Sequence, residues 1–396
     1  MTDEQLYSVN KSLDPILWHI LSVSSVPVRE FAMTMHRAVP TLAWVPQMMK
    51  TGCVRKWTRI EVCEVSGLTE LHFPLQRGYA RKYVERIARP SRQVIARLLE
   101  QSEDPQRTAL VCTSPFWAPV AEVWPGPVVY YVTDFTAAYA SLNGSQVREL
   151  DRRLCRIAAL VCPNSQRIAE YLQVEAGCDP ELIQLIPNAT RASNLRTTSH
   201  GTAPLPCDVA NIPRPIAGVI GNLAGNIDWK VVLKAVEAAP LYHWLLVGPS
   251  SMAIADIEQR DARRQTLSHP RVRSIGVRPC EVLRDYARSF DVAVLPYCRV
   301  EPTRSGSATR FYEHLAACRP MLATRGVDEL LTKVPLVRLV SNGLELGDEL
   351  LRLAQIKDDG FEETRRLASV SETWEKRAAR MIQALREVRV RHHRSR

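Results

Sequence analysis

Short apolar runs alternate with longer amphipathic segments along almost the whole chain, and this alternation limits the possible folds more than any other feature. The runs have the length and composition of buried strands, whereas apolar residues in the longer segments recur at helical spacing. Strands separated by helices predict parallel sheets with helices on both faces. The predicted strands are 17–23, 41–45, 60–65, 108–112, 128–132, 159–162, 182–186, 216–220, 243–247, 272–275, 292–295, 321–324 and 336–340. The predicted helices of the first half are 30–39, 77–100 with a break near Pro90, 145–157 and 166–175.

A chain of 396 residues is too long for one ordinary hydrophobic core and therefore predicts two domains. The alternation stops over 190–215, where Ser, Thr, Asn and Pro dominate, and such a composition indicates a linker. We predict doubly wound domains at 1–195 and 215–360, joined by a linker at 196–214. A long amphipathic helix is predicted at 361–389, followed by a basic tail at 390–396 that is expected to be disordered.

Composition excludes several classes of protein. Hydrophobic residues make up 46% of the chain and charged residues 24%, which is ordinary for a soluble globular protein and excludes disorder throughout. The apolar stretch 16–28 is interrupted by His19 and by serines and follows acidic residues, so we expect neither a signal peptide nor a membrane span. The ten cysteines show no CxxC spacing, so we expect reduced thiols of a cytoplasmic protein.

The segment 305–320 carries the most specific chemistry. It reads Ser-Gly-Ser-Ala-Thr-Arg-Phe-Tyr-Glu-His-Leu-Ala-Ala-Cys-Arg-Pro and predicts a helix that begins in small residues. Small residues at a helix start leave the first backbone N–H groups open to an anion. Arg310 and Glu313 are three residues apart, so they project from the same helix face. A cation there can hold a diphosphate and a carboxylate can accept hydrogen bonds from ribose hydroxyls, which suits a nucleotide-sugar site.

This segment resembles the donor-binding signature of GT-B glycosyltransferases, in which a small-residue loop, Lys, an aromatic pair and Glu precede Gly-Lys-Pro. The resemblance extends over roughly 128–385. Within the family, the chain is similar to the branch that includes bacterial surface-polysaccharide and teichuronic-acid glycosyltransferases. Its further elements, in the expected order, are 214–223, 227–229, 244–249, 275–276, 290–297 and 373–378. It implies two Rossmann-like domains facing a cleft, the first for the acceptor and the second for the nucleotide sugar. The long final helix would cross back to brace the first domain.

Asp134 is the candidate catalytic residue. It lies just after the predicted strand 128–132, and ligands of doubly wound folds bind at the carboxyl ends of the strands. Inverting glycosyl transfer needs a general base that takes the proton of the acceptor hydroxyl, and the resemblance implies this role for Asp134. The alternative is that Asp134 caps a helix or a turn. His36, and Ser24 with Ser25, are further candidates to face the acceptor, although a lone His is more often structural.

The resemblance implies that the donor-binding residues are Gly221, Asn222, Gly248, Ser305, Thr309, Arg310 and Glu313. Arg310 would neutralise charge on the departing diphosphate, and Glu313 would hold the ribose. The alternative is a surface ion pair between these two side chains. The family usually has Lys at the position of Arg310, and Arg changes the reach and the hydrogen-bond geometry.

Two further features bear on the donor site. Retaining members of the best-known branch carry a second Glu eight residues before the ribose Glu, where this chain has Ser305, and that departure weakens assignment as a retaining enzyme. Ser305 would bind phosphate or sugar oxygens, or act only as a helix N-cap. The glycine turns at Gly221 and Gly248 would let the backbone approach the ligand closely. No DxD-like metal site is evident, so we predict no catalytic metal and no cofactor beyond the nucleotide-sugar substrate.

The sequence therefore predicts a cytoplasmic glycosyltransferase that moves a sugar from a nucleotide diphosphate to a hydroxyl. The expected acceptor is a lipid-linked or other saccharide in surface-polysaccharide or glycolipid synthesis. The net charge of +10 is compatible with peripheral docking on an anionic membrane. Two alternatives stay open at this point. One is a non-catalytic GT-B-like subunit that binds a nucleotide sugar within a synthase. The other is a nucleic-acid-binding protein, which the lack of any recognisable binding motif disfavours.

Overall fold

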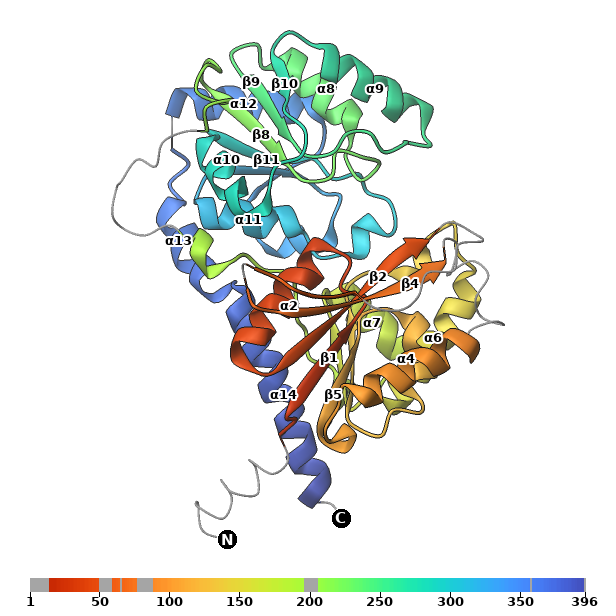
Figure 1. Cartoon of the computed structure of the whole chain (residues 1–396). Helices are drawn as coiled ribbons and strands as arrows, with labels where there is room; N and C mark the ends of the chain where they lie inside the picture. The colour runs from red at the N-terminus through yellow and green to blue at the C-terminus, as the bar shows by residue number, and fades with distance from the viewer. Residues whose placement is uncertain are drawn as a thin grey trace. The chain divides into compact units, whose positions relative to one another are not determined.

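Two separate sheets organise the chain, one in each of two units (Figure 1). The computed structural model describes residues 14–49, 59–64, 66–76, 88–195, 206–356 and 358–394. One unit consists of Met1–Pro187 with Trp374–Arg396, and the other of Asn188–Thr373. The chain thus passes between the units twice, at residues 187–188 and at 373–374.

The first unit contains a seven-stranded sheet in the order β3-β4-β2-β1-β5-β6-β7. All neighbouring strands pair in parallel except β3, which is antiparallel to β4 at the edge. The chain enters the sheet at β1 and builds outward first on one side and then on the other, which creates a switch point between β1 and β5. The strands are β1 (Leu17–Leu21), β2 (Thr41–Met49), β3 (Arg59–Val62), β4 (Thr69–Gln76), β5 (Thr108–Cys112), β6 (Val128–Val132) and β7 (Leu160–Pro163).

Helices connect these strands, and the final helix returns to this unit. They are α2 (Val26–Ala38), α4 (Ala88–Glu100), α5 (Ala118–Ala121), α6 (Gly144–Ile157), α7 (Gln166–Val174) and α14 (Trp374–Arg394). The α14 helix packs against α2, where the ring of Trp374 meets that of Phe31 (Figure 1). The prediction that a long C-terminal helix crosses back to the first domain is therefore confirmed.

The second unit contains a six-stranded, all-parallel sheet in the order β10-β9-β8-β11-β12-β13, with its switch point between β8 and β11. The strands are β8 (Ile216–Ile220), β9 (His243–Val247), β10 (Val272–Ser274), β11 (Val292–Leu295), β12 (Met321–Thr324) and β13 (Arg338–Val340). The helices are α8 (Trp229–Ala238), α9 (Ile257–Ser268), α10 (Leu283–Ser289), α11 (Thr309–Ala317), α12 (Gly343–Ile356) and α13 (Glu362–Ser371). The predicted doubly wound α/β fold class is confirmed.

Both faces of the second sheet are buried, because successive side chains of a strand point to opposite faces. Ala217 and Val219 of β8 lie in one core cluster, whereas Ile216 and Ile220 lie in another on the opposite face. Burial on both faces explains why these strands are nearly continuous apolar runs and were predicted from the sequence.

Several predicted elements differ from the structure. The predicted strand 182–186 is absent: Pro180–Leu182 forms a 3-10 turn, and Ile183 makes a single bridge to β7. Strand β4 was not predicted, because its polar residues and Pro74 are untypical of a strand. The helix predicted from 77 to 100 lies partly outside the described residues, and Pro90 does not break α4 because it lies in the first turn.

The predicted linker and tail also need correction. Within the linker predicted at 196–214, residues 196–205 lie outside the described residues, whereas Val209 and Ile212 are buried in the core of the second unit. The helix predicted at 361–389 is two helices, α13 and α14, separated where the chain passes between the units. The tail predicted as disordered continues α14 to Arg394, and Arg391 lies 3.7 Å from a carboxylate oxygen of Glu181.

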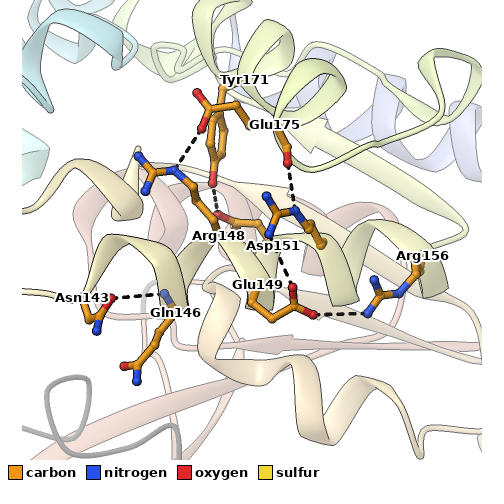
Figure 2. A network of polar contacts seen from close by, with 9 residues as sticks. Asn143, Gln146, Arg148, Glu149, Asp151, Arg156, Tyr171 and Glu175 are labelled. Atoms are coloured by element: carbon orange, nitrogen blue, oxygen red, sulfur yellow. Dashed lines mark hydrogen bonds and ion pairs between the residues drawn. The ribbon is translucent and has the colours of Figure 1, made fainter.

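A buried carboxylate fixes the helices that cover β6. Asp151 of α6 is 3% exposed and accepts hydrogen bonds from the hydroxyls of Tyr130 in β6 and Tyr171 in α7. Around it, Arg148 pairs with Glu175 at 2.9 Å, so α6 and α7 are joined at the surface as well (Figure 2). This network holds in place the strand that leads to Asp134.

The described residues include no helix with both the length and the apolar character needed to span a bilayer.

Candidate functional site

Arg310 lies at the switch point of the second sheet. Its Nε donates to the carbonyl of Ile220 at 2.6 Å, and its Nη2 donates to the carbonyl of Asn222. The guanidinium also lies over the ring of Tyr297, 4.8 Å from its centroid. The side chain thus spans the carboxyl ends of β8 and β11, the edge where doubly wound sheets bind ligands. Arg310 is only 6% exposed, so much of its hydrogen-bonding capacity orders the loop after β8.

Two glycines make this arrangement possible. Gly221 has a φ of +116°, and a side chain there would place Cβ 2.9 Å from Nε of Arg310. Gly248, after β9, has a φ of +143°, and a Cβ there would lie 1.9 Å from the carbonyl oxygen of Gly221. Only glycine fits both the backbone conformation and the contact. Asn222 is exposed beside them, so the edge presents bare backbone and an amide.

The start of α11 is occupied by a carboxylate. Glu329 accepts hydrogen bonds from the backbone N–H of Ala308 at 2.6 Å, from the hydroxyl of Ser307 at 3.0 Å and from the hydroxyl of Tyr312. A carboxylate at this position offsets the positive end of the helix. The expectation that the first N–H groups of this helix are open to an anion is therefore wrong for Ala308.

Ser305 and Thr309 are held by neighbouring groups. Ser305 is 1% exposed, and its hydroxyl donates to a carboxylate oxygen of Glu301 at 2.6 Å. It does not cap α11. Thr309 Oγ1 accepts from the Nδ2 of Asn188 at 2.8 Å, and Ser307 Oγ accepts from the backbone N–H of Asn188. The segment that begins the second unit is therefore tied to the start of α11.

Glu313 lies one turn after Arg310 and is half-buried. Its Oε2 accepts from the Nδ2 of Asn194 at 3.3 Å. The guanidinium of Arg310, in contrast, donates to main-chain carbonyls after β8 and is largely buried, so a simple surface ion pair does not describe these two side chains.

The next turn of α11 carries a buried imidazole. His314 is fully buried, and neither ring nitrogen has a hydrogen-bond partner among the described residues. Burial, together with the positive charge of Arg310, lowers the pKa of His314 to about 3. The ring is therefore neutral at physiological pH, and Arg310 supplies the positive charge on this part of the helix.

The loop after β10 is also rigidly held. Arg278 donates to the carbonyl of Ile275 at 2.5 Å and to the carboxylate of Asp208 at 2.7 Å, and the hydroxyl of Tyr286 joins the same group. Val277 is 67% exposed at the tip of this loop. The carboxyl ends of β8, β9 and β10 therefore present three ordered loops side by side.

Asp134 lies at the carboxyl edge of the first sheet. It is half-buried and accepts a hydrogen bond from the hydroxyl of Tyr139. Burial raises the pKa of Asp134, although the hydrogen bonds from Tyr139 and from the backbone of Phe135 lower it in part. Asn164, after β7, donates from Nδ2 to the carbonyl of Thr133 at 2.6 Å and so fixes the backbone next to Asp134. A carboxylate with a raised pKa at this edge is suited to proton transfer.

A second carboxylate shows that a raised pKa alone does not mark a site. Burial raises the pKa of Asp151 to about 6, against the effect of hydrogen bonds from Tyr130 and Tyr171. Both of its oxygens are engaged inside the core, under α6 and α7. Asp134 differs because it is half-buried and follows a strand end, the edge at which doubly wound sheets bind ligands.

Comparisons with known proteins agree with this architecture. Neither the protein-family models nor the curated protein sequences gave a match. Among solved structures, sucrose-phosphate synthase from Thermosynechococcus elongatus is similar, with a TM-score of 0.70 and 15% identity, over 95% of this chain and 99% of that chain. Anabaena HepE in complex with UDP-glucose has a TM-score of 0.62 and 14% identity, over 96% and 100% of the two chains. An E. coli trehalose-6-phosphate structure bound with UDP-2-fluoro glucose has a TM-score of 0.68 and 11% identity, over 93% and 99%. The chain has the GT-B fold, as its sequence predicted.

The structure brings together some of the predicted site residues. Gly221, Asn222, Gly248 and Arg310 lie at one edge of the second sheet, and Glu313 is on the same helix as Arg310. The roles assigned to them, and to Asp134, stay predictions. Six further residues hold the site and were not predicted from the sequence: Glu329, Asn188, Asn194, Tyr139, Tyr297 and Asn164. No local pattern indicates them, because each acts through contacts distant in sequence or through a turn.

The glycine pair provides a test of this packing. We expect Gly248→Ala to lower the free energy of unfolding by roughly 2–5 kcal/mol, because it combines backbone strain with a steric clash. Gly225→Ala is the matched control, since Gly225 lies in the same region with no atom within 4 Å of an added Cβ. It should change stability by less than about 1 kcal/mol. Urea unfolding of the two variants measures the difference, and equal stability would show that the turn is not tightly packed.

Proposed function

We propose that the protein is a glycosyltransferase that takes a sugar from a nucleotide diphosphate and passes it to a hydroxyl acceptor. The observation that supports this proposal most is the position of Arg310 at the switch point of the second sheet, next to the glycine turns at Gly221 and Gly248. Two of the similar structures described above hold UDP-sugars or an analogue, and their fold is the fold of this chain. The second unit would bind the nucleotide sugar, and the first unit would bind the acceptor.

In this proposal, Arg310 supplies positive charge near the diphosphate and fixes the loop that contacts it. Charge develops on the leaving diphosphate as the glycosidic bond breaks, so a fixed cation stabilises the transition state more than the ground state. Glu313 accepts hydrogen bonds from the ribose hydroxyls. Gly221 and Gly248 lack a side chain so that Arg310 and the carbonyl of Gly221 can pack against them, and the donor would contact the main chain that this packing fixes.

Asp134 is the proposed general base. Its carboxylate takes the proton from the acceptor hydroxyl while the sugar carbon forms its bond to that oxygen and loses its bond to the diphosphate. Tyr139 and the backbone N–H of Phe135 orient the carboxylate, and the lone pairs that they do not use would take the proton of the acceptor hydroxyl. The proposal includes no catalytic metal.

The acceptor is proposed to be a lipid-linked or other saccharide intermediate of surface-polysaccharide or glycolipid synthesis. A net charge of +10 favours contact with anionic lipid, where such an acceptor would lie.

Added salt should weaken binding of the protein to anionic vesicles, and a lack of binding even at low salt would contradict this docking.

Nucleotide binding tests the donor site. In calorimetric titrations with UDP, GDP, dTDP and ADP, we expect one nucleotide to bind saturably. Glu313→Gln should weaken that binding by roughly ten- to hundredfold, because one hydrogen bond to a charged group contributes about 1.5–3 kcal/mol. Asp134→Asn is the matched control, since it removes a carboxylate from the other unit and should leave nucleotide affinity unchanged. Equal weakening by both variants, or no binding of any nucleotide, would contradict the proposed donor site.

Transfer tests the catalytic residue. Once the donor nucleotide is known, Asp134→Asn should lower kcat/KM for transfer by about 10²–10⁴-fold, the range for loss of a general base. The base is active only when ionised, and burial raises its pKa. As the solution is acidified, the wild-type rate should therefore begin to fall at a pH above about 3.9, the ordinary pKa of Asp.

The same assay distinguishes an enzyme from a binding subunit. Unchanged transfer in Asp134→Asn would remove Asp134 as the base. If the wild type binds nucleotide but transfers no sugar from any donor, the chain is a non-catalytic subunit. The retaining branch has a Glu at the position of Ser305, whereas here Ser305 is buried and donates to Glu301. This departure is the reason to test the non-catalytic function as well.

A further inference from the structure

The two outermost strands of the first sheet bring two carboxylates and an imidazole together. In the antiparallel register of β3 and β4, Glu61 lies directly opposite Glu70. His72 lies two residues further along β4, so it projects from the same face as Glu70. One ligand atom from each of the three side chains lies within 4.8 Å of the other two.

Positive charge stabilises this pair of carboxylates. Like charges directly opposite each other on neighbouring strands are destabilising, and the side chain of Glu70 is only 5% exposed. Arg29 of α2 lies 2.7 Å from Oε1 of Glu70 and offsets part of the charge of Glu70. The Oε2 atoms of Glu61 and Glu70 both face the Nε2 of His72, at 3.3 and 3.4 Å.

The position of Nε2 is informative. This atom is buried, and it makes no hydrogen bond with either carboxylate, or with any other group in the described part of the chain. Its direction therefore fits a point between the two oxygens better than a hydrogen bond to either one. Two ligands bonded to a tetrahedral zinc ion at about 2.0–2.1 Å lie about 3.3–3.4 Å apart, which matches both separations.

From this geometry we propose that Glu61, Glu70 and His72 bind a divalent transition-metal ion with the ligand preference of zinc. One imidazole nitrogen with two carboxylate oxygens favours zinc-type ions over magnesium or calcium, which prefer oxygen ligands alone. Arg29 holds the outer oxygen of Glu70 and so orients the inner one, the usual role of a partner behind a metal ligand. The side chain of Glu61 is 34% exposed, and this open side leaves room for water as a fourth ligand.

The site is separate from the proposed chemistry. In the sheet order, β4 and β6 are separated by β2, β1 and β5, which makes four strand spacings, or roughly 19 Å. The ion would therefore join the edge strand β3 to β4 and would stabilise that edge instead of taking part in sugar transfer. Removal of the ion should lower the stability of the protein and leave nucleotide affinity unchanged.

Metal binding by the full-length protein tests the proposal. The chain is stripped with a chelator and titrated with Zn²⁺ in competition with a chromophoric chelator. The wild type should bind one equivalent, and Glu61→Gln and His72→Gln should each weaken binding by at least about tenfold. His269→Gln, in the second unit, is the matched control and should bind as the wild type does. Cys207→Ser is measured in parallel, because Cys207 is an exposed thiol that can bind zinc by itself.

Cobalt and heat provide a second measurement. Co²⁺ at the proposed site should give the strong visible absorption of a tetrahedral complex without a thiolate charge-transfer band. Zn²⁺ should raise the Tm of the wild type but not that of Glu61→Gln, whose partly exposed side chain makes the variant the less disruptive one. Equal Zn²⁺ binding by wild type and both variants, or a thiolate band, would overturn the proposal.

Discussion

The contact between Arg310 and the main-chain carbonyls after β8 is the interaction on which the candidate site depends. It joins α11 to the end of the first strand of the second sheet, at the point where the strand order reverses. Gly221 must lack a side chain for the guanidinium to fit, and Gly248 must lack one for Gly221 to lie where it does. One buried cation therefore fixes the backbone of the loop after β8, the loop after β9 packs against it, and the two loops together form the proposed donor site.

Glu329 changes how the start of α11 contributes to that surface. A free helix start would attract a phosphate, but here a carboxylate already accepts from Ala308, Ser307 and Tyr312. A diphosphate at this edge would rely on Arg310 and on the main chain of the glycine turns more than on the helix start. The neutral, buried His314 fits this account, because a second cation beside Arg310 would be unfavourable in the core.

Much of the fold was predictable because all neighbouring strands except β3 and β4 pair in parallel. Strands buried on both faces appear as continuous apolar runs, and β5, β6, β8, β9, β11 and β12 were predicted at their observed bounds. The edge strand pair β3 and β4 was harder, because one strand there is polar and contains Pro74. The predicted strand at 182–186 was wrong because an apolar run makes only one bridge there.

The site was predictable only where residues act near their neighbours in sequence. Arg310, Glu313 and the glycine after β8 were found from local pattern and resemblance. Glu329 is distant in sequence from the groups it contacts, and Asn164 acts by holding the backbone before Asp134.

Hydrogen exchange with and without the tightest-binding nucleoside diphosphate tests the central claim most directly. The account predicts protection of backbone amides at 220–226, 247–250 and 303–313, whereas protection confined to other parts of the chain would contradict it.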